Sequence, residues 1–317
     1  MKVLLTGITG FLGKILLDEL YKNNIQVIRL GRDLNFSQQS DYIYVDNHIS
    51  TQNFKLDAYH IDTVIHCAAR VHVMNDKDSN PLNAFRAVNT HGTLNLAQQA
   101  ANAGVKRFIF ISSIKVNGES TVLGFPFKPD DSFIPVDPYG LSKYEAEIGL
   151  RKISEKTGME VVIIRPPLVY GPGVKANFAS MMKWVNRGLP LPFGGINANK
   201  RSLVSVDNLI DLIITCIEHP NAANQTFLVS DDEDVSTSQL LINMATALAV
   251  PNRLLPFPSS LFILAAKLIG KPTVSQRLCG SLQVDISKTK KMLNWCPPYS
   301  TVECMRKTAD AFINNNK

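Results

Sequence analysis

Residues 3–13, VLLTGITGFLG, decide the fold class of this chain. The apolar run Val3–Leu5 predicts a buried strand, and the pattern over Phe11–Lys22 predicts a helix. Between them, glycines at positions 7, 10 and 13 permit a tight turn and let a pyrophosphate approach the helix N-terminus closely. The stretch therefore predicts a strand, turn and helix that bind a dinucleotide. The residues expected to contact it are Gly7, Gly10, Phe11, Leu12 and Gly13.

Short apolar runs alternate with helix-like stretches through the first 170 residues. Continuously apolar strands separated by helices are typical of a parallel sheet covered on both faces. The predicted fold class is therefore α/β with a doubly wound parallel sheet, which binds ligands at the carboxyl ends of its strands. The expected strands are Val3–Leu5, Gln26–Leu30, Tyr42–Val45, Thr63–Cys67, Arg107–Ile111 and Val161–Ile164, and the expected helices are Phe11–Lys22, Leu82–Ala103 and Tyr139–Lys156.

The composition is that of an ordinary globular chain. Of 317 residues, 45% are hydrophobic and 19% charged, with a formal charge of +6 and a pI near 9.0. The positive charge favours an anionic ligand, but the bases are too dispersed to predict nucleic-acid binding. The five cysteines form no C-x-x-C pair, which is typical of reduced thiols in the cytoplasm. The acidic run at residues 231–234 predicts a solvated turn, and no metal site is expected.

Two apolar segments bear on membrane association. The N-terminal run before Thr6 is too short for a signal peptide. The run Leu261–Ala266 is interrupted by Lys267 and cannot span a bilayer. We expect a buried helix there, with a helix docked on a partner as the alternative, and no membrane insertion.

The end of the second predicted strand bears on cofactor choice. A carboxylate at this point commonly binds the adenosine ribose of NAD. Here Gly31 and Arg32 follow Leu30, so a 2′-phosphate would be accommodated and NADP(H) is preferred. If Arg32 only stacks on adenine, NAD(H) binds as well. Further expected cofactor contacts, each near a strand end, are Asp46, Ala68, Ala69 and Pro166.

Tyr139 and Lys143 are the residues best suited to acid/base chemistry. They lie four apart on a predicted helix and so share one face. A phenol has a pKa of about 10, and a cation beside it favours the phenolate. Ser112 and Ser113, at the carboxyl end of the fifth strand, are placed to bind a carbonyl or hydroxyl oxygen, and a cap or turn is the alternative for either residue alone. An isolated Y-x-x-x-K pair is more often an ordinary helix surface, so the prediction depends on the motifs around it.

Two further polar residues lie within predicted secondary structure, one in a strand and one in a helix. His66 lies on an apolar run, which favours a hydrogen-bonded core histidine over a catalytic one. Asn89 lies inside a predicted helix, where it either braces the backbone of the site or is solvated.

The three glycines, Ser113, Tyr139 and Lys143, in this order and spacing, resemble the extended short-chain dehydrogenase/reductases that act on nucleotide-sugars. Further matches are DTVIH at 62–66, FISS at 110–113, RPPLVYGPG at 165–173 and RSLVSVDN at 201–208. The resemblance spans essentially the whole chain. It implies a Rossmann domain over residues 1–170, to which some later segments return, and a smaller C-terminal lobe, mainly residues 171–317, that closes over a UDP-sugar.

The resemblance also implies roles for individual residues. Tyr139 would be the general acid/base, Lys143 would lower its pKa and hold the nicotinamide ribose, and Ser113 would bind the reacting oxygen. The implied substrate contacts are Asn177, Arg201, Arg277 and Ser281, the last a small residue that leaves room for an N-acetyl group. Family members often form homodimers through the two long helices, here Leu82–Ala103 and Tyr139–Lys156, although the apolar faces of those helices also suit a monomer's core.

Departures from the family narrow the chemistry. Dehydratases follow the serine or threonine with an Asp-Glu pair, and Ile114 and Lys115 stand there instead, so elimination of water is not expected. Asn117 replaces a common tyrosine. Two reactions are compatible with these residues: reversible 4-epimerisation by an enzyme that retains its NAD, and a single reduction of a 4-ketosugar. The absence of a carboxylate at Gly31 favours the reduction.

Segments 70–76, 115–119 and 173–178 resemble the UDP-N-acetylquinovosamine dehydrogenases of bacterial O-antigen pathways. That likeness implies reduction of UDP-4-keto-6-deoxy-N-acetylglucosamine to UDP-N-acetylquinovosamine. A 4-epimerase acting on UDP-glucose or UDP-N-acetylglucosamine is the alternative. A non-catalytic NADP-binding sensor is the third hypothesis, disfavoured because a sensor has no need of the three catalytic side chains.

Overall fold

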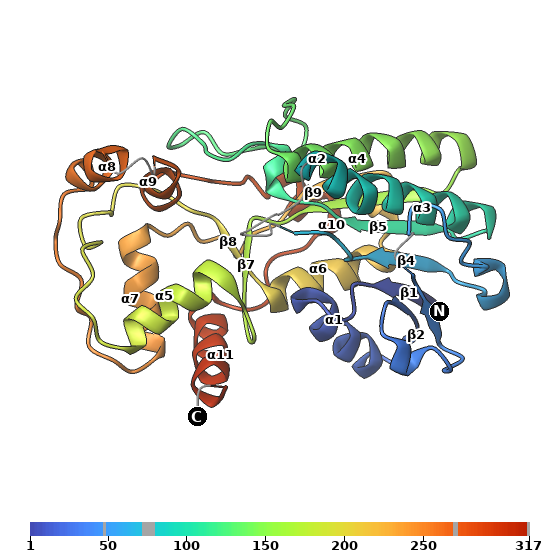
Figure 1. Cartoon of the computed structure of the whole chain (residues 1–317), viewed down its shortest axis with the longest axis horizontal. Coiled ribbons are helices and arrows are strands. Elements are labelled where there is room, and N and C mark those ends of the chain that lie inside the picture. The colour runs from blue at the N-terminus through green and yellow to red at the C-terminus, as the bar shows by residue number, and fades with distance from the viewer. Residues whose placement is uncertain (47–48, 72–79, 269–271, 316–317) are drawn as a thin grey trace.

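A parallel sheet of seven strands forms the centre of the molecule in the computed structural model, which describes residues 1–46, 49–71, 80–268 and 272–315 (Figure 1). The strand order is β3-β2-β1-β4-β5-β6-β9, and every neighbouring pair is parallel. The predicted α/β doubly wound fold is therefore confirmed. Its strands are β1 (Lys2–Thr6), β2 (Gln26–Gly31), β3 (Tyr42–Tyr44), β4 (Thr63–His66), β5 (Arg107–Ile111), β6 (Glu160–Arg165) and β9 (Thr226–Leu228).

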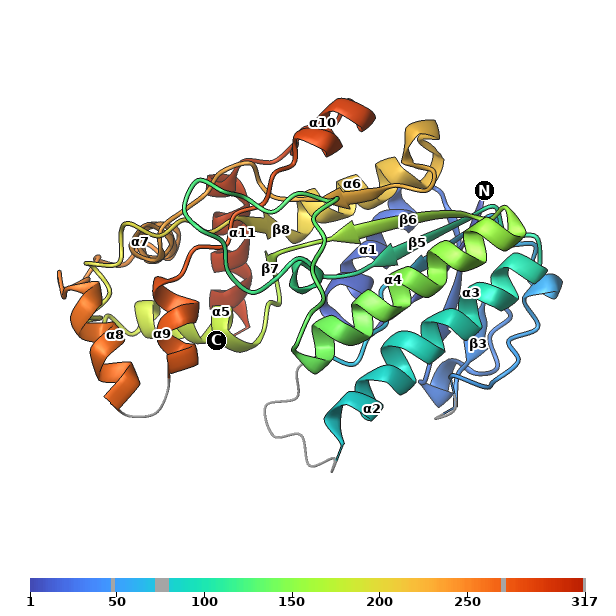
Figure 2. The same cartoon turned by 90° about the horizontal axis from the view of Figure 1, so that it is seen from above.

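Helices cover both faces of this sheet. Val3 and Leu5 pack with α1 (Phe11–Lys22) and α6 (Val206–Glu218), whereas Leu4 packs with helices α3 (Thr93–Asn102) and α4 (Pro138–Thr157). Figure 2 shows α3 and α4 side by side on their face. Successive strand residues point to opposite faces, so a strand that is apolar throughout needs a helical layer on each side.

The long helix expected over Leu82–Ala103 has a local irregularity. It consists of α2 (Pro81–Phe85), a π-helical stretch at Arg86–Gly92, and α3. The wide turn directs Asn89 and Thr90 inward, where both are buried. Such bulges are frequent at functional sites.

A second group of elements, here called the lobe, packs beside the carboxyl edge of the sheet (Figure 1). It has its own apolar cluster, which includes Tyr170, Phe178, Leu241 and Met305. The lobe elements are β7 (Leu168–Tyr170), β8 (Leu203–Ser205), α5 (Ala176–Asn186), α7 (Thr237–Ala247), α8 (Ser259–Leu268), α9 (Pro272–Cys279) and α11 (Thr301–Asn314).

The chain passes between the sheet and the lobe more than once. After β8, it returns to the sheet through α6 and β9, and Thr289 of α10 (Ser287–Leu293) donates a hydrogen bond to the Leu228 carbonyl. A domain boundary at residue 170 with later returns stays a prediction. Four short 3-10 turns complete the description: Leu34–Phe36, Leu56–Tyr59, Ile114–Val116 and Pro220–Ala222.

The expectation of a buried helix over Leu261–Ala266 is wrong. The helix forms as α8, but Leu261, Ile263 and Leu264 are each about half exposed, at 48%, 46% and 53%. It lies at the tip of the lobe, beside α9, with no layer of the described chain above it (Figures 1 and 2). Among the described residues, no helix has the length and hydropathy needed to cross a membrane. Residues 72–76, part of one resembling segment, lie outside the described ranges.

Candidate active site

The glycine-rich turn after β1 packs tightly against its neighbours. Gly7 has a φ of +76°, and a Cβ there would lie 2.8 Å from the Ala68 nitrogen. A Cβ on Gly13 would lie 2.1 Å from the Gly7 carbonyl oxygen, so the helix can approach the strand only with glycine at this position. No side chain caps α1 at Gly10. The free N–H groups at the start of α1 therefore suit the pyrophosphate of a dinucleotide.

The end of β2 lacks space for a carboxylate. A Cβ on Gly31 would lie 2.7 Å from the phenol oxygen of Tyr42, which is itself buried and accepts a hydrogen bond from the Asp33 N–H at 2.8 Å. Arg32, the next residue, is exposed. An adenosine ribose at this edge would therefore meet a guanidinium rather than an acid.

The other expected cofactor contacts surround the carboxyl edge of the sheet. Ala68 and Ala69 follow β4, and the Ala68 N–H donates to the Thr6 hydroxyl at 3.1 Å. Pro166 follows β6, is buried, and accepts from the Ile114 N–H at 3.0 Å. Asp46 is exposed just beyond β3. All four lie after strand ends, as the sequence predicts.

Tyr139 is fixed in the first turn of α4. Asp137 caps the helix by accepting from the Gly140 N–H at 3.1 Å, and Pro138 occupies the first helical position. Burial raises the pKa of Tyr139 to about 12, whereas its hydrogen bond with Ser113 lowers that pKa. The ring of Phe85 meets Tyr139 edge-on, with ring centres 6.0 Å apart. The structure thus brings Ser113 and Tyr139 into contact.

Lys143 lies one turn further along α4 and is only 1% exposed. Its ammonium donates to the Ile111 carbonyl at 2.9 Å and sits 4.4 Å from the centre of the Phe110 ring. Burial lowers the pKa of Lys143 to about 8, while the nearby carboxylate of Glu147 opposes that shift. The sequence predicted the pair but gave no signal for the carbonyl and ring that hold the lysine.

A buried polar network supports the end of β5. The hydroxyl of Ser112 donates to Glu147 at 2.6 Å, and Glu147 forms an ion pair with Arg165 at 2.6 Å. Arg165 also donates to the Asn117 side-chain oxygen at 2.9 Å, and Asn117 donates to the Lys128 carbonyl. Ser112 and Asn117 are thus parts of the scaffold, while the neighbouring Ser113 reaches the site.

Asn89 braces the backbone beside the site, as one of the two predictions for it proposed. It accepts from the N–H of Arg70 at 2.8 Å and donates to the carbonyl of Arg70 at 3.0 Å. It also donates to the Ser142 hydroxyl at 3.0 Å. The π-helical stretch allows this contact because it turns Asn89 toward α4.

His66 is a hydrogen-bonded core residue, as predicted. Its two ring nitrogens lie 2.8 Å from the Thr6 hydroxyl and 2.9 Å from the Thr93 hydroxyl. Burial and the charge of Lys143 lower the pKa of His66 to about 3. It therefore stays neutral near pH 7.

Three of the four expected substrate residues come together where residues 200–202 pair with 281–282. Arg201 donates to the carbonyls of Arg277 and Gly280 at 2.9 and 3.1 Å, and burial lowers its pKa. The Ser281 hydroxyl accepts from the Lys200 N–H. The Arg277 side chain is exposed on α9. Asn177 is exposed on a separate element, the first turn of α5.

The segment between β5 and α4 connects the sheet to the lobe, which the sequence did not predict. The Thr121 N–H donates to the Ser281 carbonyl at 2.8 Å, and the Phe127 N–H donates to the Gln283 carbonyl at 2.9 Å. The loop that carries the chain from Ser113 to Tyr139 is therefore attached to the expected substrate side.

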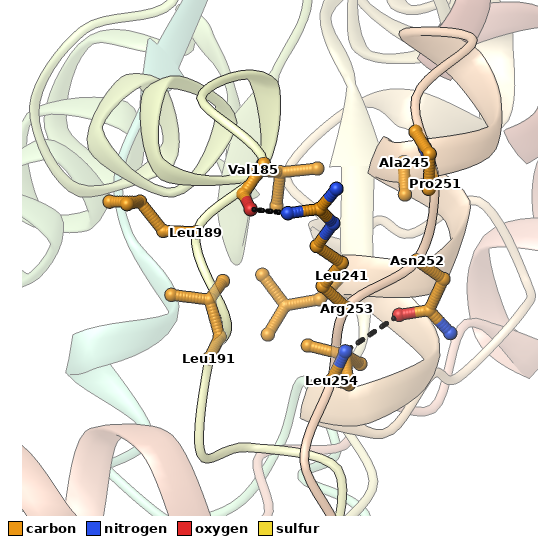
Figure 3. A pocket seen from close by; sticks show the side chains of 10 residues that line it. Val185, Leu189, Leu191, Leu241, Ala245, Pro251, Asn252, Arg253 and Leu254 are labelled. Carbon is orange, nitrogen blue, oxygen red and sulfur yellow. Dashed lines mark hydrogen bonds between the residues drawn. The ribbon is translucent and has the colours of Figure 1, made fainter.

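A small cavity inside the lobe is not a nucleotide site. It lies between α5, α7 and residues 251–254 and has a volume of about 10 Å³, room for a single water (Figure 3). Arg253 closes one side by donating to the Gly188 carbonyl at 3.2 Å. Within the described residues, no group of three or more His, Cys, Asp or Glu side chains is placed to hold a metal.

Residues 3–230 match the NAD dependent epimerase/dehydratase family, and the chain belongs to that family. It is 51% identical to a UDP-glucose 4-epimerase of Vibrio cholerae over 315 residues, which cover 99% of this chain and 96% of that one.

Two solved structures share the fold. A UDP-glucose 4-epimerase of Thermotoga maritima, crystallised with UDP-glucose, superposes with a TM-score of 0.79 at 21% identity, covering 100% of both chains. A UDP-glucuronic acid 4-epimerase of Bacillus cereus in complex with NAD superposes with a TM-score of 0.77 at 21% identity, also covering 100% of both chains.

These findings confirm the predicted family and the nucleotide-sugar enzyme class. At the finer level they favour the activity that the sequence placed second, because the relative at 51% identity is named a UDP-glucose 4-epimerase. The family is NAD-dependent, and nothing in the comparisons singles out NADP.

Proposed function

We propose that this protein is a UDP-hexose 4-epimerase. The observation that carries the proposal is the cluster of Ser113, Tyr139 and buried Lys143 beside the glycine-rich turn, in a chain 51% identical to a UDP-glucose 4-epimerase. Bound NAD supplies a reversible acceptor for the hydride at C4 of the sugar. Tyr139 takes the proton from the C4 hydroxyl and later returns it, and Ser113 holds the same oxygen by a hydrogen bond.

Lys143 makes this proton transfer feasible at neutral pH. With a pKa of about 8, it is mostly an ammonium at pH 7. We propose that its positive charge favours the phenolate of Tyr139 over the phenol. Burial raises the pKa of Tyr139, and the hydrogen bond with Ser113 opposes that shift. Because Lys143 is held by a backbone carbonyl, the charge is positioned before substrate arrives.

The residues after Ser113 argue against a dehydratase. Ile114 is buried, and Lys115 is paired with Glu119 at 2.9 Å and Asp137 at 3.2 Å. Loss of water from C5 and C6 of a hexose needs an acid and a base at these two positions. The pair present here supplies neither carboxylate.

Arg201 and Arg277 are proposed to bind the UDP diphosphate, since guanidinium groups form strong charge-assisted hydrogen bonds with phosphate. Both lie near Ser281, whose small side chain is engaged with Lys200 and leaves room for a 2-acetamido group. We therefore include UDP-N-acetylglucosamine among the substrates, with Asn177 as a further sugar or phosphate contact.

A second candidate function is reduction of UDP-4-keto-6-deoxy-N-acetylglucosamine by NADPH in the cytoplasm. Tyr42 crowds the position at Gly31 where an NAD-specific carboxylate would stand, and Arg32 is exposed beside it. That arrangement suits a 2′-phosphate. A reductase releases and rebinds its cofactor in every cycle, so selective binding of NADP(H) matters more to it than to an epimerase that retains its NAD.

One pair of assays separates the two functions. UDP-glucose and UDP-N-acetylglucosamine are incubated with the protein and NAD, without reductant, and the products are resolved by chromatography. Formation of the galacto sugars supports the epimerase. Consumption of NADPH with the 4-ketosugar, and no change in the first assay, supports the reductase. Inactivity in both would overturn both proposals and favour the sensor.

A further inference from the structure

Helix α8 presents an apolar stripe to solvent. Leu261, Leu264 and Leu268 are spaced at i, i+3 and i+7, so they share one face, and Leu268 is 79% exposed. The same apolar character continues before the helix, where Leu255 and Phe257 are 52% and 42% exposed. These five residues, with Ile263, are called the α8 surface.

A ring contact attaches α8 to the rest of the lobe. Phe262 packs edge-on against Phe193, with ring centres 5.7 Å apart. Helix α8 lies at the tip of the lobe, far from the sheet (Figures 1 and 2). A contiguous exposed apolar patch is commonly a site of interaction with a partner or a membrane.

The charge of the segments that supply most of the lobe helices restricts what can cover this stripe; the remaining lobe helix, α11, carries Glu303 and Asp310. Residues 161–206 and 235–284, which supply α5, α7, α8 and α9, contain no aspartate or glutamate. They contain ten bases, more than the formal net charge of +6, so the rest of the chain is net acidic. The ten are Arg165, Lys175, Lys183, Arg187, Lys200, Arg201, Arg253, Lys267, Lys271 and Arg277.

Exposed bases lie next to the stripe. Lys267 is in the last turn of α8 and Arg277 is on the adjoining α9, whereas Arg253 lies at the cavity between α5 and α7. Apolar residues flanked by Lys and Arg on a short helix are typical of a helix lying in the plane of a bilayer interface. A ten-residue helix is too short to cross the bilayer.

We propose that the α8 surface docks this protein peripherally on an anionic membrane. The leucines enter the boundary between headgroups and acyl chains, and Lys267 contacts lipid phosphates. A second copy of the chain is disfavoured as the occupant because it would bring together two α8–α9 segments that are each basic and contain no carboxylate of their own. The proposal does not depend on which sugar reaction the protein catalyses.

The test uses the full chain and two kinds of vesicle, one of phosphatidylcholine alone and one of equal parts phosphatidylcholine and phosphatidylglycerol. We expect co-sedimentation with the anionic vesicles only, weakened by added salt. Combined Leu261→Ser, Leu264→Ser and Leu268→Ser should weaken binding by roughly tenfold or more. Lys267→Glu should weaken it by about fivefold.

Matched controls keep the result interpretable. Val302→Ser removes an apolar side chain that is 76% exposed on α11, and it should leave vesicle binding unchanged. Turnover of a soluble UDP-sugar should be the same in all variants, which shows that they fold. Absence of binding to anionic vesicles, or binding that survives the triple substitution, would overturn the proposal. So would a dimer in sedimentation velocity that the triple substitution dissolves.

Discussion

The carboxyl edge of the sheet and the α8–α9 end of the lobe are built in opposite ways. At the sheet edge, Lys143 is 1% exposed and held by a backbone carbonyl, and Ser112, Glu147 and Arg165 form a closed network. At the α8–α9 end, Arg277 and most of α8 are exposed. The groups proposed for the chemistry are thus fixed in advance, whereas Arg277 and the α8 leucines remain exposed to ligands.

This difference leads to different expected effects of substitution. Burial strengthens electrostatic interactions and makes an unpaired charge costly, whereas an exposed charge is solvated with or without its partner. Substitutions at the sheet edge should therefore cause large losses, and those in the lobe should cause smaller and more selective ones.

The largest effect is expected from Tyr139→Phe, which removes the proposed proton donor and acceptor. Turnover should fall by about 10³-fold, while binding of the dinucleotide, followed by fluorescence, should persist. Tyr144→Phe on the same helix is the control and should keep near-normal activity. Substantial turnover by Tyr139→Phe would remove this residue from the chemistry.

Glu147→Gln tests the buried network directly. It leaves Arg165 without its carboxylate partner, and we expect a loss of about 3 kcal/mol in the free energy of unfolding, measured with urea. Glu145→Gln disrupts a partly exposed pair with Arg86 and should cost less than about 1 kcal/mol. Equal losses in the two variants would show that burial does not distinguish the two pairs.

His66 should make the fold sensitive to acid. Its pKa is about 3 in the fold and 6.5 in the unfolded chain, so below pH 6.5 the unfolded state binds a proton that the folded state does not. Stability should therefore fall as pH drops from 6.5 toward 3, by about 1.4 kcal/mol per pH unit from this group. His66→Gln should flatten this slope, and His91→Gln, at an exposed site, should keep it. Urea midpoints at pH 7 and pH 5 measure the difference.

Arg32→Glu tests cofactor selection at an exposed position. If Arg32 contacts the 2′-phosphate as proposed, the ratio of NADPH affinity to NADH affinity should fall by about tenfold, because that contact is replaced by repulsion. Lys22→Glu on α1 changes the charge equally and should leave the ratio unaltered. If Arg32→Glu has no effect on the ratio of dissociation constants, the predicted NADP preference is wrong.

The smallest effect is expected from Arg277→Ala. An exposed guanidinium contributes modestly to diphosphate binding, so KM for the UDP-sugar should rise about fivefold with little change in kcat. Arg253→Ala, another exposed arginine of the lobe, should leave KM unchanged. A fall in kcat as large as the change in KM would place Arg277 in the chemistry and weaken the contrast between the two regions.

The sequence predicted the sheet well because its elements have strong local patterns. The strand expected at Gln26–Leu30 differs from β2 by a single residue, and the helix expected at Phe11–Lys22 has the bounds of α1. The bulge at Arg86–Gly92 was missed because an extra residue in one turn leaves the apolar spacing of the helix nearly intact. Ser112 and Ser113 are alike in sequence, and only the direction of each side chain separates scaffold from site.

The sequence by itself determined the parallel sheet, the glycine-rich turn and the helix that carries Tyr139 and Lys143, because apolar periodicity, glycine spacing and helix register are local properties of a chain. Only the tertiary structure decided that Glu147 and Arg165 are buried together, that Arg201 meets the carbonyl of Arg277, and that α8 is exposed. Those outcomes depend on which distant segments pack against one another. An apolar run favours burial, but its sequence does not determine which surface, if any, covers it.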